Sequence, residues 1–258
     1  MKTYIHITTL LLISIFSSTS QAQLDFGIVE GEVQEAVDGS PWSGSFAAGL
    51  NGKTGNSENI DINVSLNVVR ETELNKTALL ANYFFSSNDV STVTDRLFGQ
   101  ARNERRLANP RWGAFVQAQY EWDRFKTFDF RLALHGGLTF EVFKYDDRFL
   151  KLRLGAGASR EFGDDALDLE WIPELQFGGD WERQLNDTVK LFASSDYFPN
   201  VSDFADYRLV TNAGLEFVLH EARDINFRMF ALHRYDSTPV SGDQETDLDY
   251  GMAISVGF

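Results

Sequence analysis

The sequence predicts an all-β protein: a single antiparallel transmembrane β-barrel of about 12 strands that follows a cleaved N-terminal signal peptide. Three observations lead to this fold class. Apolar and polar residues alternate with a period of two over most of the chain, the alternating segments are about 10–15 residues long, and the chain opens with the features of an export signal. Successive side chains of a strand point to opposite faces, and a tilted strand crosses a bilayer in about 9–11 residues.

The composition excludes several other classes of protein. The chain has 258 residues and a formal net charge of −15, whereas a protein that binds nucleic acid regardless of sequence needs a basic surface. It has no cysteine and therefore neither a disulfide framework nor a thiolate metal site. No apolar run reaches the roughly 18 residues of a membrane-spanning helix. We therefore expect no nucleic-acid partner, no cofactor and no helical anchor.

The export signal occupies residues 1–22. Lys2 provides its positive charge, residues 10–16 (LLLISIF) form its apolar stretch, and Ser20-Gln21-Ala22 is an acceptable small-x-small cleavage site. We predict cleavage after Ala22. Gln23 stands where a lipoprotein would carry cysteine.

The exported chain divides into a lead-in and a barrel. Residues 23–41 contain acidic residues and no basic one, and we interpret them as a short acidic periplasmic lead-in. Residues 42–258 form the barrel. Its strand candidates are, in order, 42–51, 58–69, 77–86, 92–102, 111–122, 128–142, 149–161, 167–181, 188–197, 206–219, 225–235 and 247–258. The third and fourth are the weakest, because Ala78 to Phe85 is apolar on both faces and Asp95 to Arg106 is mostly charged.

Two architectures use alternating strands of this kind. A soluble sandwich or lipocalin-like barrel turns its apolar face inward, whereas a transmembrane barrel turns it toward lipid and keeps a polar lumen. The strand length favours the membrane barrel. So do the many charges on the polar face, which would be costly in a dry core. Aromatic residues also lie at the ends of the apolar faces, as in the interfacial girdles of membrane barrels: Trp42, Trp112, Tyr120, Trp122, Phe130, Trp171, Trp181 and Tyr197.

The last strand resembles the C-terminal targeting strand of bacterial outer-membrane barrels. One apolar face carries Tyr250, Met252, Ile254, Val256 and the terminal Phe258. This resemblance implies that the barrel-assembly machinery reads these residues. It also implies residence in the outer membrane of a Gram-negative bacterium, in contact with lipid and lipopolysaccharide.

Other motifs resemble one family in particular. The stretch from Trp42 to Leu50 (WSGSFAAGL) precedes residues 54–57 (TGNS), and residues 120–125 (YEWDRF) precede Leu154-Gly-Ala-Gly-Ala. In this order they are similar to the YdiY-like family of salt-induced outer-membrane proteins, over roughly residues 42–258. The resemblance implies a β-barrel of unassigned function and supplies no catalytic residues.

The residues alone give little support for an enzyme. Outer-membrane lipases place a histidine beside a serine, but the residues after His135, His220 and His233 do not form a His-x-Ser motif. Proteases of the omptin type pair acidic residues with an Asp-His couple, and no Asp-x-His occurs. We interpret His135 as a hydrogen-bonded residue of the lumen and predict that the protein is not an enzyme.

An acidic loop near the C-terminus is a candidate metal site. Its carboxylates Asp243, Glu245, Asp247 and Asp249 could bind Ca²⁺, but they lack the spacing and the central glycine of an EF-hand. We interpret the segment as a solvated loop and predict no metal site.

Transport and structure remain as the predicted functions. The charged and polar positions expected to line the lumen are Glu121, Arg131, His135, Glu141, Arg153, Glu170, Glu174, Arg208, Glu216 and Arg228. The first hypothesis is a small, porin-like channel for ions or small solutes that prefers cations. The second is a non-conducting structural barrel with a salt-bridged lumen, because both signs of charge are abundant. A hydrolase is a remote alternative. An even strand count places both ends of the barrel on the periplasmic side.

Overall fold

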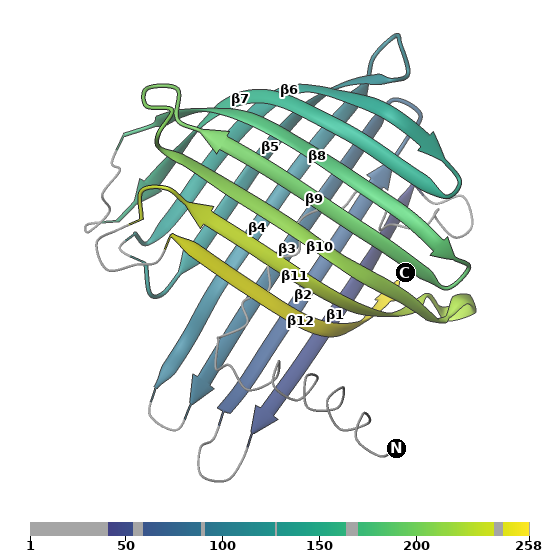
Figure 1. Cartoon of the computed structure of the whole chain (residues 1–258), viewed down its shortest axis with the longest axis horizontal. Helices are drawn as coiled ribbons and strands as arrows, with labels where there is room; N and C mark the ends of the chain where they lie inside the picture. The colour runs from purple at the N-terminus through teal and green to yellow at the C-terminus, as the bar shows by residue number, and fades with distance from the viewer. Residues whose placement is uncertain are drawn as a thin grey trace, which may run out of the picture.

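In the computed structural model the chain forms one closed barrel of twelve antiparallel strands (Figure 1). The structure describes residues 41–53, 59–88, 91–126, 128–163, 170–239 and 245–257. Each strand pairs with the next one in the chain, and β1 pairs with β12. The predicted fold class and strand number are therefore confirmed. The predicted signal peptide and nearly all of the predicted lead-in lie outside the described residues.

The strand bounds agree closely with the predicted ranges. The strands are β1 (Trp42–Lys53), β2 (Asn59–Glu71), β3 (Asn75–Asn88), β4 (Thr92–Arg106), β5 (Trp112–Asp123), β6 (Phe130–Tyr145), β7 (Arg148–Phe162), β8 (Ile172–Asn186), β9 (Val189–Pro199), β10 (Tyr207–His220), β11 (Ile225–Asp236) and β12 (Thr246–Gly257). The charged fourth segment is a strand and runs on to Arg106. No helix in the described part of the chain is long and apolar enough to cross a membrane.

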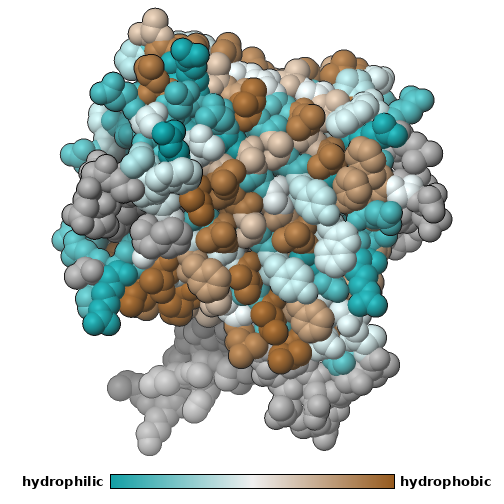
Figure 2. Space-filling model, turned by 180° about the vertical axis from the view of Figure 1, so that it is seen from behind, coloured by the Kyte–Doolittle hydropathy of each residue, from teal (hydrophilic) through white to brown (hydrophobic). Residues whose placement is uncertain are grey.

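The barrel is polar inside and apolar outside. On β6, Leu134 and Leu138 are 51% and 44% exposed, whereas His135 between them is 3% exposed. The same alternation places Val116 of β5 outside and its neighbour Gln117 inside. Figure 2 shows hydrophobic residues across the middle of one face and hydrophilic residues toward its margins. A large exposed apolar belt around a polar interior is the arrangement of a barrel that spans an outer membrane.

Aromatic side chains lie at both ends of this belt. At the end where β1 begins, Trp42, Trp112 and Tyr145 are exposed. At the other end, rings stack across neighbouring strands, with Tyr197–Tyr207 and Tyr207–Tyr235 centroids 5.3 and 5.4 Å apart. Amphipathic rings in these positions match the headgroup level of a bilayer, so the predicted aromatic girdles are present.

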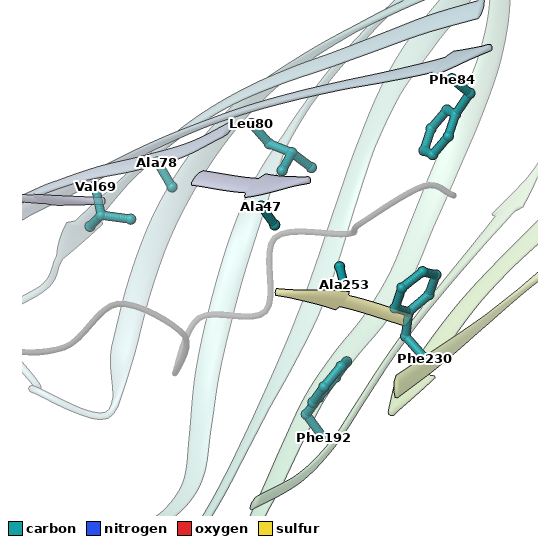
Figure 3. Packing of buried hydrophobic residues seen from close by; sticks show 8 residues of the cluster. All are labelled: Ala47, Val69, Ala78, Leu80, Phe84, Phe192, Phe230 and Ala253. Carbon is teal, nitrogen blue, oxygen red and sulfur yellow. The ribbon is translucent and has the colours of Figure 1, made fainter. Parts of the chain in front are cut away.

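The interior departs from the predicted polar face at one place. Eight buried apolar residues form a cluster inside the barrel, contributed by β1 to β3, β9, β11 and β12: Ala47, Val69, Ala78, Leu80, Phe84, Phe192, Phe230 and Ala253 (Figure 3). We call it the apolar cluster. It explains why residues 77–86 are apolar on both faces, since Leu80 and Phe84 point inward while Leu79 and Tyr83 face outward.

The connections at the two ends of the barrel differ in length. Those at the end where β1 begins are 72–74, 107–111, 146–147, 187–188 and 221–224. Those at the opposite end are 54–58, 89–91, 124–129, 163–171, 200–206 and 237–245, of which the last four are longer than any at the first end. We call these the short-turn end and the loop end. Outer-membrane barrels have short periplasmic turns and longer external loops, so this asymmetry agrees with periplasmic ends of the barrel.

Candidate functional site

Among the described residues, a cavity lies toward each end of the lumen. The loop-end cavity has a volume of about 240 Å³ and lies among the first residues of β4, β6, β8 and β10 and the last residues of β5, β7, β9 and β11. The short-turn cavity has a volume of about 230 Å³ and lies among the opposite ends of β2 to β8. Both are lined by charged side chains. This pair of cavities is the candidate site.

The loop-end cavity carries both signs of charge in balance. Its basic residues are Arg96, Arg102, Lys126, Arg131, Arg160, Arg208 and Arg234. Its acidic residues are Glu121, Glu161, Glu174, Asp196, Asp206, Asp236 and Glu245. Among the described residues, therefore, the lining does not carry the strong negative charge of the whole chain. The predicted preference for cations is not supported by this lining.

One wall of this cavity is an ion-paired row on β5, β6 and β7. Glu121 and Arg131 are register partners on adjacent strands, as are Arg131 and Glu161. The Arg131 guanidinium donates to Glu121 at 3.4 Å and to Glu161 at 2.5 Å. An arginine between two carboxylates is held by charge-assisted hydrogen bonds on both sides. The row is therefore tied together by ion pairs and carries a formal net charge of −1.

The floor of the loop-end cavity is built around Glu174 of β8. Its carboxylate accepts hydrogen bonds from His135 Nε2 at 3.0 Å, Ser159 Oγ at 3.0 Å and Arg208 at 2.6 Å. His135 also packs against the Phe198 ring, with centroids 5.1 Å apart. Four strands, β6 to β8 and β10, thus meet at one buried carboxylate. The prediction of a hydrogen-bonded lumen histidine agrees with this geometry.

A layer of buried side chains lies between the two cavities. It contains Gln117, His135, Arg153, Gln176 and Asp180, none of which lines either cavity. The side chains of Arg153 and Asp180 form an ion pair and are 1% and 0% exposed. Arg153 also pairs with Asp196 at 3.1 Å, and Asp196 lines the loop-end cavity. We call these five residues the barrier layer.

Below the barrier layer, Glu104 anchors the short-turn cavity. Its carboxylate accepts from Lys151 at 3.0 Å and from Thr139 Oγ1 at 2.9 Å. The three residues come from β4, β6 and β7, so this contact crosses part of the lumen instead of joining neighbouring strands. Glu141 also lines this cavity.

The predicted lumen residues fall into groups. Glu121 joins Arg131, while His135, Glu174 and Arg208 meet one another. Glu216 of β10 pairs with Arg228 at 2.6 Å and Lys190 at 3.1 Å. Glu170 differs from its prediction, because it is exposed and precedes β8. It occurs before the strand begins, so its place in the alternation does not determine the direction of its side chain.

Several lumen residues were missed by the sequence reasoning: Arg96, Arg102, Glu104, Lys151, Glu161, Asp180, Lys190 and Asp196. Each of them shares odd or even parity with a buried inward neighbour on its strand, such as Lys151 with Arg153 or Asp180 with Glu174. Extending the alternation along each strand would have found them. Their pairing would not have followed, because it depends on how strands lie across the lumen.

The geometry around His135 is not that of a serine hydrolase. In such a site the histidine lies between the serine and the carboxylate, whereas here Glu174 lies between His135 and Ser159. Among the described residues, no group of three or more His, Cys, Asp or Glu side chains is arranged to hold a metal ion. Part of the acidic loop 243–249 lies outside these residues.

The sequence profile of one family matches residues 46–258, described as a protein of unknown function, DUF481. The chain belongs to the DUF481 family. The matched region of the DUF481 protein begins within β1 and includes the other eleven strands of the barrel. No curated protein matches its sequence.

Solved structures similar to the DUF481 barrel include bacterial outer-membrane proteins. A NanC porin is 10% identical, with 84% of this chain and 97% of that chain covered and a TM-score of 0.48. An outer-membrane channel from Pseudomonas putida F1 is 9% identical, with coverages of 91% and 98% and a TM-score of 0.47. The translocator domain of the autotransporter NalP from Neisseria meningitidis is 14% identical, with coverages of 86% and 89% and a TM-score of 0.44. No substrate or activity of the DUF481 barrel follows from likenesses at this level.

Proposed function

We propose that this DUF481 barrel is a small channel for ions or small solutes in the outer membrane. The observation that carries the proposal is the pair of charged cavities at opposite ends of one membrane-spanning barrel. Twelve strands lie between the side-chain-filled barrels of eight strands and the open porins of sixteen or more. The barrier layer then acts as the gate that separates the two cavities.

The gate consists of groups that can rearrange without leaving the lumen. Arg153 already has a second carboxylate, Asp196, on the side of the loop-end cavity. Movement of its guanidinium toward Asp196 would leave an aqueous gap beside Asp180, and the charges would stay solvated as the gap fills with water. Hydrogen-bonded polar groups that line a lumen can therefore support a path that an apolar plug would block.

The balanced lining predicts weak charge selectivity. Neither cavity has a ring of one sign among its described residues, and such rings are what give cation or anion channels their selectivity. We therefore infer that the channel passes small ions of both signs, and dipolar solutes as well.

Planar-bilayer recording of the refolded, full-length mature protein tests this proposal. Discrete current steps are expected, with a reversal potential near zero in a KCl gradient. Silence at all voltages would overturn the channel and leave a structural barrel. A reversal potential close to the potassium equilibrium value would keep the channel but contradict the weak selectivity.

A non-conducting structural barrel is the second candidate. It is favoured by the buried Arg153–Asp180 pair and by the apolar cluster, which both fill the middle of the lumen. A hydrolase has no comparable support, because Ser159 is engaged by Glu174.

Two further expectations accompany the proposal. The outward row of β12, in which Met252, Ile254 and Val256 are exposed, would be read by the barrel-assembly machinery. Phe258, which ends this row, lies outside the described residues. Salt induction follows from the resemblance to the YdiY-like family alone, and a rise in the protein's abundance when cells are moved to high salt would support it.

A further inference from the structure

The boundary between β1 and β12, which we call the seam, is paired over only part of its length. Its ladder joins Ser45 to Gly257 and stops at Ala48 and Ile254. By contrast β1 pairs with β2 from Trp42 to Lys53, and β12 pairs with β11 from Thr246 to Val256. Both strands are therefore fully formed beside the part of the seam where they do not meet. In Figure 1 the two strands diverge from their short pairing toward the loop end.

An unpaired seam within a bilayer needs an explanation. Backbone N–H and C=O groups that face hydrocarbon without partners are costly, which is why membrane barrels are closed. The residues of the unpaired part lie within the apolar belt, because Leu50, Leu248 and Met252 are 71%, 53% and 45% exposed. The opening therefore faces lipid in the leaflet on the side of the loop end.

The interior immediately behind the opening is also apolar. Ala253 and Phe230, from β12 and β11, belong to the apolar cluster, and Phe230 is the register partner of Gly251 in the open part of β12. Phe192 continues the cluster and is 1% exposed (Figure 3). A hydrocarbon chain would meet apolar surface on both sides of the wall. Arg228 and Arg96 stack on the cluster rings of Phe192 and Phe84, with 5.6 and 5.5 Å between guanidinium carbon and ring centroid.

Two buried amides lie beside the same seam, and three of their four polar atoms have no hydrogen-bond partner among the described residues. Asn63 and Asn67 of β2 are 5% and 4% exposed, and they are register partners of Gly49 and Ser45 on β1. Among the described residues, Asn63 Oδ1 and both amide atoms of Asn67 have no hydrogen-bond partner. Asn63 Oδ1 lies 2.8 Å from the position that a Cβ of Gly49 would occupy, so this amide reaches the seam itself. A buried polar group without a protein partner needs one from water or from a ligand, and Asn63 differs from the other such groups of the lumen in lying against Gly49, in the unpaired part of the seam.

We propose that the unpaired part of the seam is a lateral opening that admits a single-chain amphiphile from the bilayer. Its hydrocarbon tail lies along the apolar cluster, and an uncharged hydroxyl or amide head group bonds to Asn63, the amide that reaches Gly49 at the edge of the opening. An uncharged head fits because amides supply donors and acceptors without a compensating charge. This route passes through the barrel wall and does not depend on conduction along its axis.

The opening is tested by disulfide formation, for which the cysteine-free chain is well suited. Leu50→Cys with Met252→Cys probes the unpaired part, and Ala48→Cys with Ile254→Cys, a register pair on the same face, is the control. A disulfide requires Cα atoms about 4.4–6.8 Å apart. We expect the control pair to oxidise readily and the test pair to stay reduced under the same conditions. Equal oxidation of both pairs would show a closed seam and overturn the opening.

The ligand is tested with the unmodified mature protein in liposomes that contain a diazirine-bearing hexadecanol. After irradiation, we expect labelled peptides that include the inward Phe192 and Phe230, with labelling suppressed by excess plain hexadecanol. Asn63→Leu should reduce inward labelling about tenfold, the loss expected from removal of a hydrogen bond worth about 1.4 kcal/mol. Asn212→Leu is the matched control, because Asn212 is a buried amide with an unpaired oxygen on β10, away from the seam.

Two results would contradict the ligand. Labelling confined to lipid-facing residues would show that the probe does not enter. Inward labelling that appears only after residues 23–40 are deleted would make the chain's own N-terminal segment the occupant.

Discussion

Gly157 of β7 and His135 of β6 are register partners, and the backbone of His135 occupies the space that a side chain at Gly157 would need. A Cβ at Gly157 would lie 2.7 Å from His135 Cα. The absence of a side chain lets His135 lie flat against β7 and reach Glu174 on β8. The glycine thus positions the central hydrogen bond of the lumen floor.

We expect Gly157→Ala to destabilise the barrel by about 1–3 kcal/mol or more, because overpacking forces the backbone apart. Gly99→Ala is the control, since its nearest atoms would be 3.9 Å away. The readout is the temperature at which the heat-modifiable folded band disappears in detergent. Equal midpoints for the two variants would contradict this packing.

Arg153→Met should destabilise the barrel by about 3–5 kcal/mol, because it removes the arginine partner of a buried carboxylate. The Asp180 side chain is 0% exposed. Adding Asp180→Leu should recover much of the loss, since the double variant replaces the pair with apolar groups. Urea unfolding in lipid vesicles measures both. A double variant that is less stable than the single one would show that the pair is not the source of the effect.

A lysine in the apolar belt should cost more at its middle than at its edge. Leu138 lies mid-strand in β6 and Tyr145 ends that strand, and they are 44% and 58% exposed. Leu138→Lys should cost about 2–4 kcal/mol and Tyr145→Lys about 0–1 kcal/mol. Unfolding in vesicles is the measurement. A soluble barrel would tolerate both substitutions equally well.

The orientation in the membrane is tested by labelling intact cells with a membrane-impermeant maleimide. Asp203 lies in a connection at the loop end and Asp187 in one at the short-turn end, and both are exposed. Asp203→Cys should react on intact cells, and Asp187→Cys only after the outer membrane is permeabilised. The reverse pattern would invert the topology.

The strands and their faces were predictable because both follow from local alternation. Leu134, His135 and Leu138 lie on the sides that the period of two gives them. The pairs formed by register neighbours, such as Glu216 with Arg228, would follow once consecutive strands are paired in order.

Contacts between strands that are not neighbours depend on the shape of the closed barrel. Glu104 and Lys151 come from β4 and β7, and nothing local indicates that they meet. The apolar cluster likewise joins β3 to β9 and β11 across the lumen. The partial seam could not be predicted either, because the alternation of β1 and β12 would be the same in a fully paired ladder.

The most direct test of the gated channel is a comparison of single-channel conductance between the wild-type protein and Arg153→Ala with Asp180→Ala. Asp203→Ala, in an exposed loop, is the control. We predict small discrete steps for the wild type and the control, and steps several times larger for the double variant, because the barrier layer is then opened. A double variant that folds and conducts no better than the wild type would contradict a gate at Arg153 and Asp180.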